Sequence, residues 1–345
     1  METYQTVYLM KDLRNYSLLP HNTFGIDARC QRFMEYASVS EAVLIARQLS
    51  QPFIIIGGGS NLLLTRDYEG TVVRSAITGM ELLSEPTIGD VLVRVGSGEE
   101  WDAVVARFVE KGWHGAENLS LIPGDVGAAA VQNIGAYGAE VCDIIERIEA
   151  ISIPDGELVT IQASDCQYGY RQSRFKQEWK NRYLITHVVF RLSHTFAPRL
   201  DYGNIRAELE REGISEPTPQ QLRQAIIRIR EEKLPDPKVE GNAGSFFMNP
   251  VVSREQFESL LAEYPLMPHY HIDEQHEKIP AGWMIEQCGW KGRTVGHAGV
   301  HSKQALVLVN RGGATGQEVV DLCNAIRADV LQKFGIEINP EVNII

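Results

Sequence analysis

Residues 122–140 form the stretch of this sequence whose composition best suits the binding of a ligand. They read IPGDVGAAAVQNIGAYGAE, so that four glycines are interspersed with five alanines and Asp125 is the only charge before Glu140. Glycine lets the backbone adopt positive φ and approach a ligand closely. Small side chains leave peptide N–H groups uncovered, as in sites that bind phosphates and flat cofactors. The composition favours a cofactor loop, and the alternative is a tight helix–strand junction packed against another backbone.

A second glycine run, GGGSN at 57–61, follows a buried strand expected at 53–56. It is not a dinucleotide fingerprint, because Leu62 stands where the third glycine belongs and SNLLLTRDYEG is too short for the crossover helix. A strand that ends in a glycine turn facing an anion fits this pattern. A plain strand-to-strand turn fits equally well.

Two other segments carry polar groups in unusual surroundings. Residues 168–176, YGYRQSRFK, set three cations among three aromatic side chains in an otherwise acidic chain. For Arg174 and Lys176 the pattern favours a surface turn whose side chains extend to solvent. Ser245 stands between Gly244 and two phenylalanines, so its hydroxyl is either a packing detail or a positioned group.

Cysteine and histidine usage does not predict a metal site. The five cysteines are scattered without a C-x-x-C pair, which indicates reduced thiols and no zinc. His269, His271 and His276 form the only histidine cluster, within a proline-bracketed segment typical of a surface loop. Metal binding there is a weak alternative, and we expect no metal.

Local signals predict the elements that position these groups. Helices are expected from Ser38 until Pro52, and over 99–111, 218–233 and 315–335, where capping residues, proline or glycine mark the ends. Strands are expected at 53–56, 72–74, 91–95, 144–153, 157–161 and 183–192. The acidic first turn of the 99–111 helix would repel a phosphate, so we interpret that segment as structural. The tail over 336–344 alternates, which places Glu341 by default on the solvent side of a strand.

Length and charge limit the class of protein. A chain of 345 residues suggests two or three domains, with a boundary near 202–219. The net charge of −12 argues against general binding to nucleic acid or a membrane surface. No apolar run is long enough to span a bilayer, and the N-terminal segment has no signal-peptide pattern. We therefore expect a cytoplasmic protein.

Taken in order, six motifs resemble the UDP-N-acetylenolpyruvoylglucosamine reductase (MurB) family over nearly the whole chain. They are GGGSNLLL, IPGDVGAAAVQNIGAYGAE, YGYRQSRFK, KLPDPKVEGNAGSFFMNP, the segment around Gln304 and the terminal PEV. The pairing of GNAGSFF with QNIGAYG is highly specific, whereas GGGSN alone is weak. The resemblance implies an α+β fold: a two-lobed FAD-binding region of the vanillyl-alcohol-oxidase (PCMH) type and a C-terminal α+β substrate-binding domain. We expect lobes at 1–70 and 71–200 and the substrate domain at 201–345, with a return of the last strand to the FAD region as an alternative.

The resemblance also implies an activity. NADPH would reduce FAD, hydride would reach C3 of an enolpyruvyl group on a UDP-sugar, and a proton would reach C2, giving UDP-N-acetylmuramate. Ser245 matches the family's proton donor, and Arg171 and Glu341 match the pair that holds and polarises the substrate carboxylate. Tyr202 matches the tyrosine that closes over the substrate in the type with a mobile loop. Further substrate contacts match Lys233, Asn249 and Gln304.

The two glycine-containing stretches match the loops around FAD. The residues expected to contact FAD are Gly57, Gly58, Gly59, Ser60, Asn61, Ile122, Pro123, Gly124, Gly127, Ala128, Gln132, Asn133, Gly135, Ala136, Tyr137 and Gly138. We expect a monomer whose partners are FAD, NADPH and a UDP-sugar, without nucleic acid or membrane.

The sequence departs from the family at its tail. Asn343 stands where the family often carries arginine, and the sequence stops at Ile345 without the usual short extension. The resemblance therefore implies the role of Glu341 but not an arginine that helps to orient it. Two rival hypotheses stay open. One is a flavin oxidase of the same fold that uses oxygen, and the other is a nucleotide-sugar-binding module without flavin. A serine hydrolase is disfavoured because the sequence has no G-x-S-x-G elbow.

Overall fold

The computed structural model describes residues 10–86 and 89–345, which separate into two compact units. The described part of the first unit consists of residues 10–16, 30–58, 68–86 and 89–232. The second unit gathers Ser17–Arg29, Gly59–Asp67 and Lys233–Ile345. The three-domain division expected from the sequence stays a prediction, and residues 1–9, where no signal segment is expected, lie outside the described residues.

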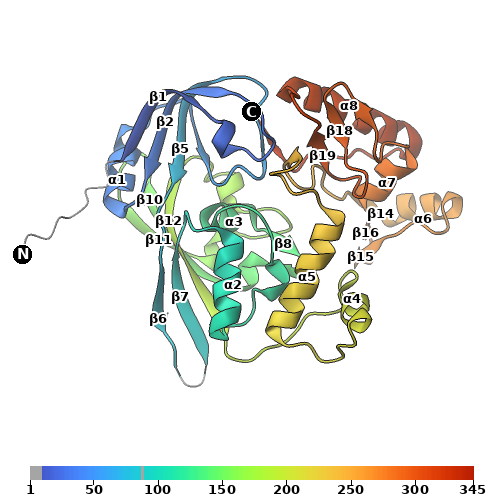
Figure 1. Ribbon diagram of the computed structural model, residues 1–345, viewed down its shortest axis with the longest axis horizontal. Coiled ribbons are helices and arrows are strands. Elements are labelled where there is room, and N and C mark those ends of the chain that lie inside the picture. The colour runs from blue at the N-terminus through green and yellow to red at the C-terminus, as the bar shows by residue number, and fades with distance from the viewer. Residues whose placement is uncertain (1–9, 87–88) are drawn as a thin grey trace, which may run out of the picture. The chain divides into compact units, whose positions relative to one another are not determined.

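The first unit is built on two sheets (Figure 1). In the first sheet the strands run in the order β1-β2-β5-β3, with β5 parallel to both β2 and β3. Its bounds are β1 Lys11–Ser17, β2 Arg29–Tyr36, β3 Phe53–Ile56 and β5 Tyr68–Ser75, with helix α1 at Val39–Gln48. Ser38 caps α1 by accepting the Glu41 N–H, as the sequence predicts.

The second sheet is antiparallel in the order β11-β10-β12-β7-β6. Its bounds are β6 Met80–Ser84, β7 Asp90–Gly96, β10 Ile145–Ser152, β11 Leu158–Gln162 and β12 Tyr183–Ser193. Inward-facing valines of β7 join a buried cluster with helices α2 (Trp101–Lys111) and α3 (Val126–Gln132), which lie beside this sheet in Figure 1. The strands expected at 53–56, 72–74, 91–95, 144–153, 157–161 and 183–192 and the helix at 99–111 are confirmed, and α3 is a helix that the sequence left open. The expectation for the tail is wrong, because only Asn343–Ile344 forms a strand there and Glu341 is half-buried outside it.

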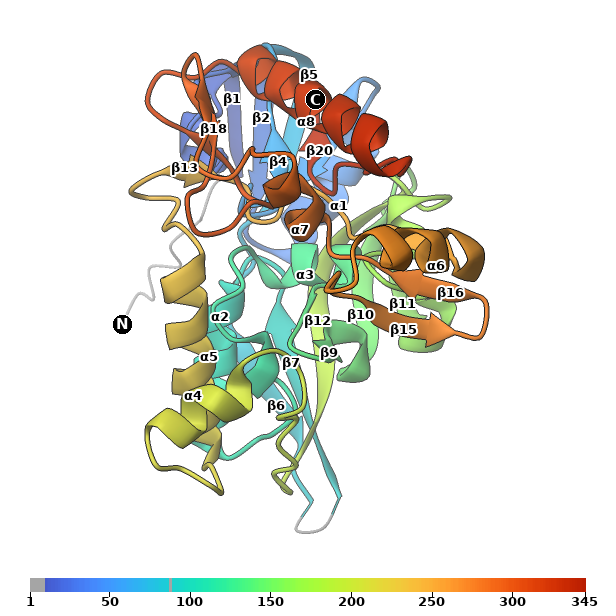
Figure 2. The ribbon, with the colours of Figure 1, turned by 90° about the vertical axis from the view of Figure 1, so that its right-hand side faces the viewer.

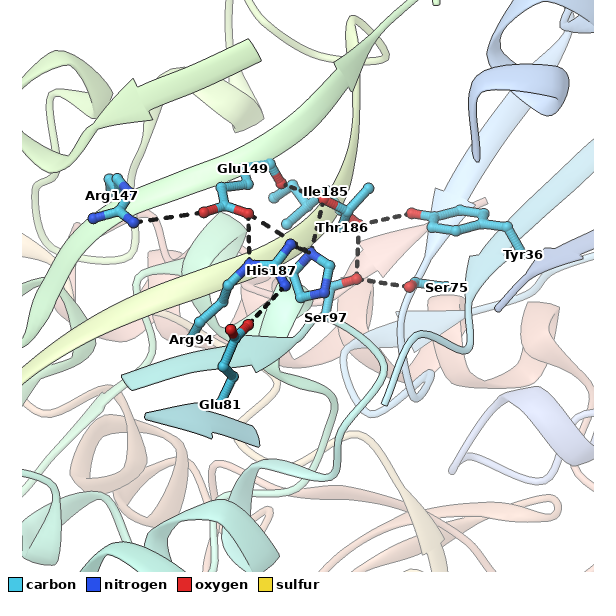
Figure 3. A network of polar contacts seen from close by, with 10 residues as sticks. All are labelled: Tyr36, Ser75, Glu81, Arg94, Ser97, Arg147, Glu149, Ile185, Thr186 and His187. Atoms are coloured by element: carbon cyan, nitrogen blue, oxygen red, sulfur yellow. Dashed lines mark hydrogen bonds and ion pairs between the residues drawn. The ribbon is translucent and has the colours of Figure 1, made fainter. Parts of the chain in front are cut away.

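A buried chain of hydroxyl groups connects the two sheets of the first unit (Figure 3). The Tyr36 hydroxyl donates to the Ile185 carbonyl oxygen at 2.8 Å, and Ser97 Oγ donates to the same oxygen at 2.7 Å. Ser97 Oγ also lies 2.6 Å from Ser75 Oγ. Since Tyr36 and Ser75 come from the first sheet and Ile185 from the second, this network fixes one sheet against the other.

Helices α4 (Ile205–Arg211) and α5 (Pro219–Lys233) complete the first unit. Their apolar faces form one buried cluster, which includes Ile205, Leu209, Leu222, Ala225, Ile226 and Ile229. Thr218 Oγ1 accepts the Gln221 N–H, and Gln221 Oε1 accepts the Thr218 N–H, so the predicted capping box of α5 is confirmed.

The second unit contains three small sheets (Figure 2). One has the order β13-β19-β18-β17 and packs against helix α8, which in turn contacts α7, and another has the order β14-β16-β15 and packs against α6. The bounds are β13 Gly241–Asn242, β14 Val251–Ser253, α6 Arg254–Glu263, β15 Tyr270–Asp273, β16 His276–Lys278, α7 Ala281–Gln287, β17 Thr294–Val295, β18 Ala298–Val300, β19 Leu308–Asn310 and α8 Gly316–Phe334. The interpretation of the histidine segment as a surface loop is wrong, because His271 and His276 lie in the antiparallel pair β15 and β16.

The third sheet pairs strands that are far apart in the sequence. Strand β20 (Asn343–Ile344) lies parallel to β4 (Leu62–Leu63), with Asn343 opposite Leu62. The C-terminal strand therefore returns to the end of the GGGSN segment. Two short strands, β8 (Gly135–Ala136) and β9 (Ala139–Glu140), form a hairpin in the first unit.

The predicted capping box of α8 makes the stability of the second unit depend on pH. Thr315 Oγ1 accepts the Glu318 N–H at 3.2 Å, and Glu318 Oε2 accepts the Thr315 N–H at 2.8 Å. This backbone bond, with His297 beside the carboxylate, lowers the pKa of Glu318 to about 2. Because the folded-state pKa is the lower one, the stabilisation is complete above the unfolded-state pKa and is lost as pH falls toward 2.

We therefore expect Glu318→Gln to lower the urea midpoint at pH about 7 and to lower it progressively less as pH falls from about 4.5. Equilibrium unfolding followed by circular dichroism measures this, with Glu337→Gln, an exposed carboxylate of the tail, as the control. A loss of the same size at every pH would contradict the assignment.

Candidate active site

Two glycine-containing segments of the first unit pack backbone against backbone. A Cβ on Gly57 would lie 2.7 Å from the Ala128 Cβ, and one on Gly58 would lie 3.2 Å from the Gly124 Cα. Side chains at either position would force the segments apart. This close packing accounts for glycine at 57 and 58, and it brings the two candidate FAD loops together, forming a cradle of small residues that suits a flat or phosphate-bearing cofactor.

Some of the amides in this cradle are already used. The Val126 N–H donates to the Glu99 carbonyl oxygen at 2.9 Å, and the Gly127 N–H donates to the Ser97 carbonyl oxygen at 2.8 Å. The alanines after them form α3, which is the helix–strand junction that the sequence offered as an alternative. The junction interpretation therefore holds for this part of the stretch, and the FAD contacts of Gly127 and Ala128 stay predictions.

Asn133 joins three segments around the cradle. Its side chain is fully buried, with Nδ2 donating to Glu140 Oε2 at 2.9 Å and to the Gly169 carbonyl oxygen at 2.8 Å, and Oδ1 accepting the Cys142 N–H. It ends α3 in the left-handed conformation, with φ of 44°. The side chain thus has a structural role, whatever its backbone contacts.

The hairpin β8–β9 turns at Tyr137 and Gly138, whose φ values are both positive, as a tight two-residue turn requires. The predicted substrate-covering loop packs on this turn: a Cβ on Gly138 would lie 3.4 Å from the Tyr202 Cβ, and one on Gly203 would lie 3.5 Å from the Tyr137 ring. Tyr202 is 40% exposed. The loop therefore lies beside the predicted FAD residues.

Arg171 is held against the same hairpin. Its guanidinium donates to the Gly135 carbonyl oxygen at 2.5 Å and to the Asn133 carbonyl oxygen at 3.3 Å. Lys176 Nζ donates to the Arg171 carbonyl oxygen at 2.7 Å, so Lys176 supports this segment in addition to reaching the surface. Arg174 stacks on Trp179, 4.0 Å from the ring centre, as a surface residue does.

A second arginine, Arg230 on α5, lies close to Arg171, and the sequence did not indicate it. Burial lowers the pKa of Arg230, Tyr137 and Asp102 oppose this effect, and Arg171 adds to it. Its Nε donates to the Leu121 carbonyl oxygen at 3.2 Å. One sequence feature could have indicated Arg230: Arg223 and Arg230 are seven residues apart and so lie on the same side of α5, beside its apolar stripe.

Arg223, the other arginine on this side of α5, has a structural role. It makes a two-point ion pair with Asp102 at 2.6 and 2.9 Å, and the same carboxylate accepts the Leu121 N–H. Asp102 thus fixes the start of the 122–140 stretch, which agrees with the structural interpretation of the 99–111 helix.

In the second unit the Ser245 segment lies between two others. The Phe246 N–H donates to the Leu306 carbonyl oxygen at 2.7 Å, and the Phe246 carbonyl oxygen accepts the Glu341 N–H at 2.8 Å. Ser245 is exposed and Glu341 is half-buried. The backbone therefore brings Ser245, Glu341 and the segment after Gln304 together, although they lie far apart in the sequence.

The remaining predicted substrate residues of this unit have backbone partners. Asn249 Oδ1 accepts the Ala281 N–H at 2.9 Å, and Gln304 Oε1 accepts the Leu306 N–H at 3.3 Å. Each side chain keeps its amide NH₂ as a further donor group. Lys233 is half-buried at the end of α5.

The C-terminal strand connects Glu341 with the GGGSN segment. Asn61 Nδ2 donates to the Glu341 carbonyl oxygen at 3.4 Å, and Asn343 donates to the Asn61 carbonyl oxygen from both its backbone and its side chain, at 3.1 and 3.0 Å. Asn343, where the family often has arginine, therefore fixes the tail. Gly59 is required here, since its φ is +69° and a Cβ would lie 2.0 Å from the His21 carbonyl oxygen.

The other residues predicted to contact FAD, Ser60, Ile122, Pro123, Gln132 and Ala136, lie on these same segments. Their contacts, and the substrate roles above, stay predictions. Among residues 10–86 and 89–345 no group of three or more histidine, cysteine or acidic side chains could hold a metal ion. In the same part of the chain no helix is both long and apolar enough to cross a membrane.

Comparison with known proteins identifies the two regions. Residues 33–162 match the profile of an FAD binding domain, and residues 236–345 match the C-terminal domain of UDP-N-acetylenolpyruvoylglucosamine reductase. A crystal structure of UDP-N-acetylenolpyruvylglucosamine reductase from Thermus caldophilus has the same fold, with a TM-score of 0.66 over 97% of this chain and 98% of that one, at 21% identity. Together with the glycine cradle, these findings define the class: an FAD-containing oxidoreductase of α+β construction.

Curated relatives make the assignment specific. The chain is 57% identical to the UDP-N-acetylenolpyruvoylglucosamine reductase of Bacteroides fragilis, over 96% of this chain and 99% of that protein. It is 48% identical to the Pseudomonas aeruginosa protein of the same name, over 95% and 97%. The chain belongs to the UDP-N-acetylenolpyruvoylglucosamine reductase (MurB) family, and the predicted α+β fold, FAD and enzyme class are confirmed.

Proposed function

We propose that this chain uses NADPH to reduce the enolpyruvyl group of UDP-N-acetylenolpyruvoylglucosamine to UDP-N-acetylmuramate, a step of peptidoglycan precursor synthesis. The observation that carries the proposal is the hydrogen bond between the Phe246 carbonyl oxygen and the Glu341 N–H. It supports a shared role for Ser245 and Glu341, the hydroxyl and carboxylate that the family motifs single out. Membership of the reductase family supplies the reaction.

When bound, FAD supplies the hydride that adds to C3 of the enolpyruvyl group. The protein's side chains stabilise the negative charge that this addition creates and deliver the proton to C2. Addition of hydride leaves an enolate of a carboxylic acid, which needs a donor or cation beside its oxygens and an acid beside C2. Ser245 gives the proton to C2, since a carbon-centred enolate is basic enough to take it from a hydroxyl.

Arg171 binds the substrate carboxylate through its planar guanidinium, which can make two parallel hydrogen bonds to it. Glu341 assists in orienting and polarising this group. The carbonyl oxygens of Gly135 and Asn133 hold the Arg171 guanidinium in place before substrate arrives, which reduces the cost of ordering it.

Recognition of the UDP-sugar is assigned to the remaining predicted residues. Lys233 suits the diphosphate because an ammonium group is a compact point charge, and Asn249 and Gln304 provide amide donors. Tyr202 covers the bound substrate. We further propose that the enzyme works as a monomer in the cytoplasm, without nucleic acid or membrane.

An anaerobic absorption experiment tests the reaction. The purified protein should be yellow, NADPH should bleach the flavin bands, and UDP-N-acetylenolpyruvoylglucosamine should restore them in one turnover. A yellow protein whose flavin NADPH does not bleach would favour the rival oxidase, which uses oxygen instead of NADPH. A colourless protein that does not take up FAD would favour the nucleotide-sugar-binding module.

A further inference from the structure

A chain of four charged side chains leads from the edge of the first sheet to the glycine cradle. Lys11 Nζ lies 2.5 Å from Glu35 Oε1, Arg74 Nη1 lies 3.0 Å from Glu35 Oε2, and Arg74 Nη2 lies 3.2 Å from Asp125 Oδ2. The side chains of Glu35 and Asp125 are only 7% and 10% exposed. We call Lys11, Glu35, Arg74 and Asp125 the Arg74 chain.

Asp125, at the end of this chain, lies inside the cradle. Its Oδ1 is 3.0 Å from the position that a Gly58 Cβ would take. It precedes α3 but makes no capping hydrogen bond to that helix, because the carboxylate faces Arg74. A carboxylate in a loop expected to receive a diphosphate needs a physical reason, since two anions in a poorly hydrated site repel each other.

Arg74 supplies that reason. It stands on β5 opposite Ile56, the residue before Gly57, so it reaches the cradle from beneath the first glycine loop. Lys11 also forms an ion pair with Glu35, so Arg74 is not the only cation that neutralises Glu35 and part of its charge remains for Asp125. Arg74 Nε is buried and has no hydrogen-bond partner within the described chain, so the guanidinium still has a donor to offer.

We propose that Arg74 and Asp125 are positioning residues for FAD: their ion pair joins strand β5, which pairs with the strand that leads into Gly57, to the loop at 124–128, and Arg74 cancels the charge of Asp125 where the FAD diphosphate binds. The inference rests on the proposed placement of FAD at Gly57, Gly58 and 124–128. It predicts that the arginine matters for FAD binding chiefly because the aspartate is there. Burial raises the pKa of Asp125, and Arg74 opposes this effect.

The test is a double-mutant cycle on FAD binding to apoprotein, measured by quenching of flavin fluorescence at pH about 8. Arg74→Gln leaves Asp125 unpaired beneath the diphosphate and should weaken FAD binding about tenfold or more. Asp125→Asn removes the anion and should leave FAD binding as tight as in the wild type, or tighter. The double variant should recover most of the loss.

Arg94→Gln is the matched control. Arg94 has a similar side-chain exposure, 26% against 23% for Arg74, and also pairs with two carboxylates, Glu149 at 2.7 Å and Glu81 at 3.3 Å. It lies between Val93 and Val95, whose side chains join the buried cluster containing α3, so it points to the opposite face of that sheet (Figure 3). Its FAD affinity should be unchanged.

Several outcomes would overturn the proposal. They are unchanged FAD affinity in Arg74→Gln, weaker binding in Asp125→Asn, and a double variant that binds as weakly as Arg74→Gln, which would indicate packing alone. Gly57→Ala separates this failure from a failure of the placement. Its Cβ would collide with Ala128 and should weaken FAD binding, and normal binding there would show that FAD lies elsewhere.

Discussion

Replacing Ser245 with alanine is expected to leave the protein folded and its flavin reducible by NADPH, and to slow reduction of the enolpyruvyl group by roughly 10²–10⁴-fold. The hydroxyl is exposed, and its backbone neighbours are held through Phe246, so the substitution removes a proton donor and little packing. The two half-reactions occur separately. Stopped-flow absorbance therefore measures them independently.

The pattern of rates identifies the role of Ser245. A slow second half-reaction with a normal first one is the expected result, and cysteine at this position, which restores an acidic proton, should recover part of the rate. Ser302→Ala, an exposed serine of the same unit, is the control. Near-normal turnover in Ser245→Ala would remove Ser245 from the mechanism.

Arg171→Ala is expected to cost about 3 kcal/mol of transition-state stabilisation, or roughly 10² in kcat, because one donor to the enolate is lost. Arg171 also supports the β8–β9 hairpin through Gly135, so FAD affinity has to be measured alongside turnover. A loss of turnover at constant FAD affinity is the expected result. Arg174→Ala, which removes a surface arginine of the same segment, should leave both unchanged.

Arg171→Lys sharpens the comparison. Lysine retains the charge but makes a single-point contact, so it should recover only part of the rate. If kcat in Arg171→Ala equals that of the wild type, the carboxylate role is wrong. If FAD affinity falls in parallel with turnover, Arg171 acts by holding the hairpin.

Local patterns were sufficient for the elements whose ends are marked by capping groups. The Thr218 and Thr315 boxes placed α5 and α8 to within a residue, because a cap and its helix are neighbours in the chain. The pairing of strands that are distant in the sequence is not marked by any local sequence pattern. The parallel alignment of β2 with β5 and of β4 with β20 depends on contacts that no short window contains.

The candidate site shows the same division. Composition identified the 122–140 stretch and the GGGSN run, and motif resemblance identified Ser245, Arg171 and Glu341. Neither could show that the Val126 and Gly127 amides are already occupied, or that Asn133 is a buried structural residue. Arg74 and Arg230 were missed because their significance lies in which carboxylate or carbonyl they reach, and that is fixed only in three dimensions.

The pairing of β4 with β20 bears on how the chain is made. Strand β4 forms the partner of a strand that begins 281 residues later, from Leu62 to Asn343. Translation adds about 5–20 residues each second. Strand β4 is therefore synthesised many seconds before its partner strand β20. The yield of folded enzyme should therefore be sensitive to the speed of elongation between these two points.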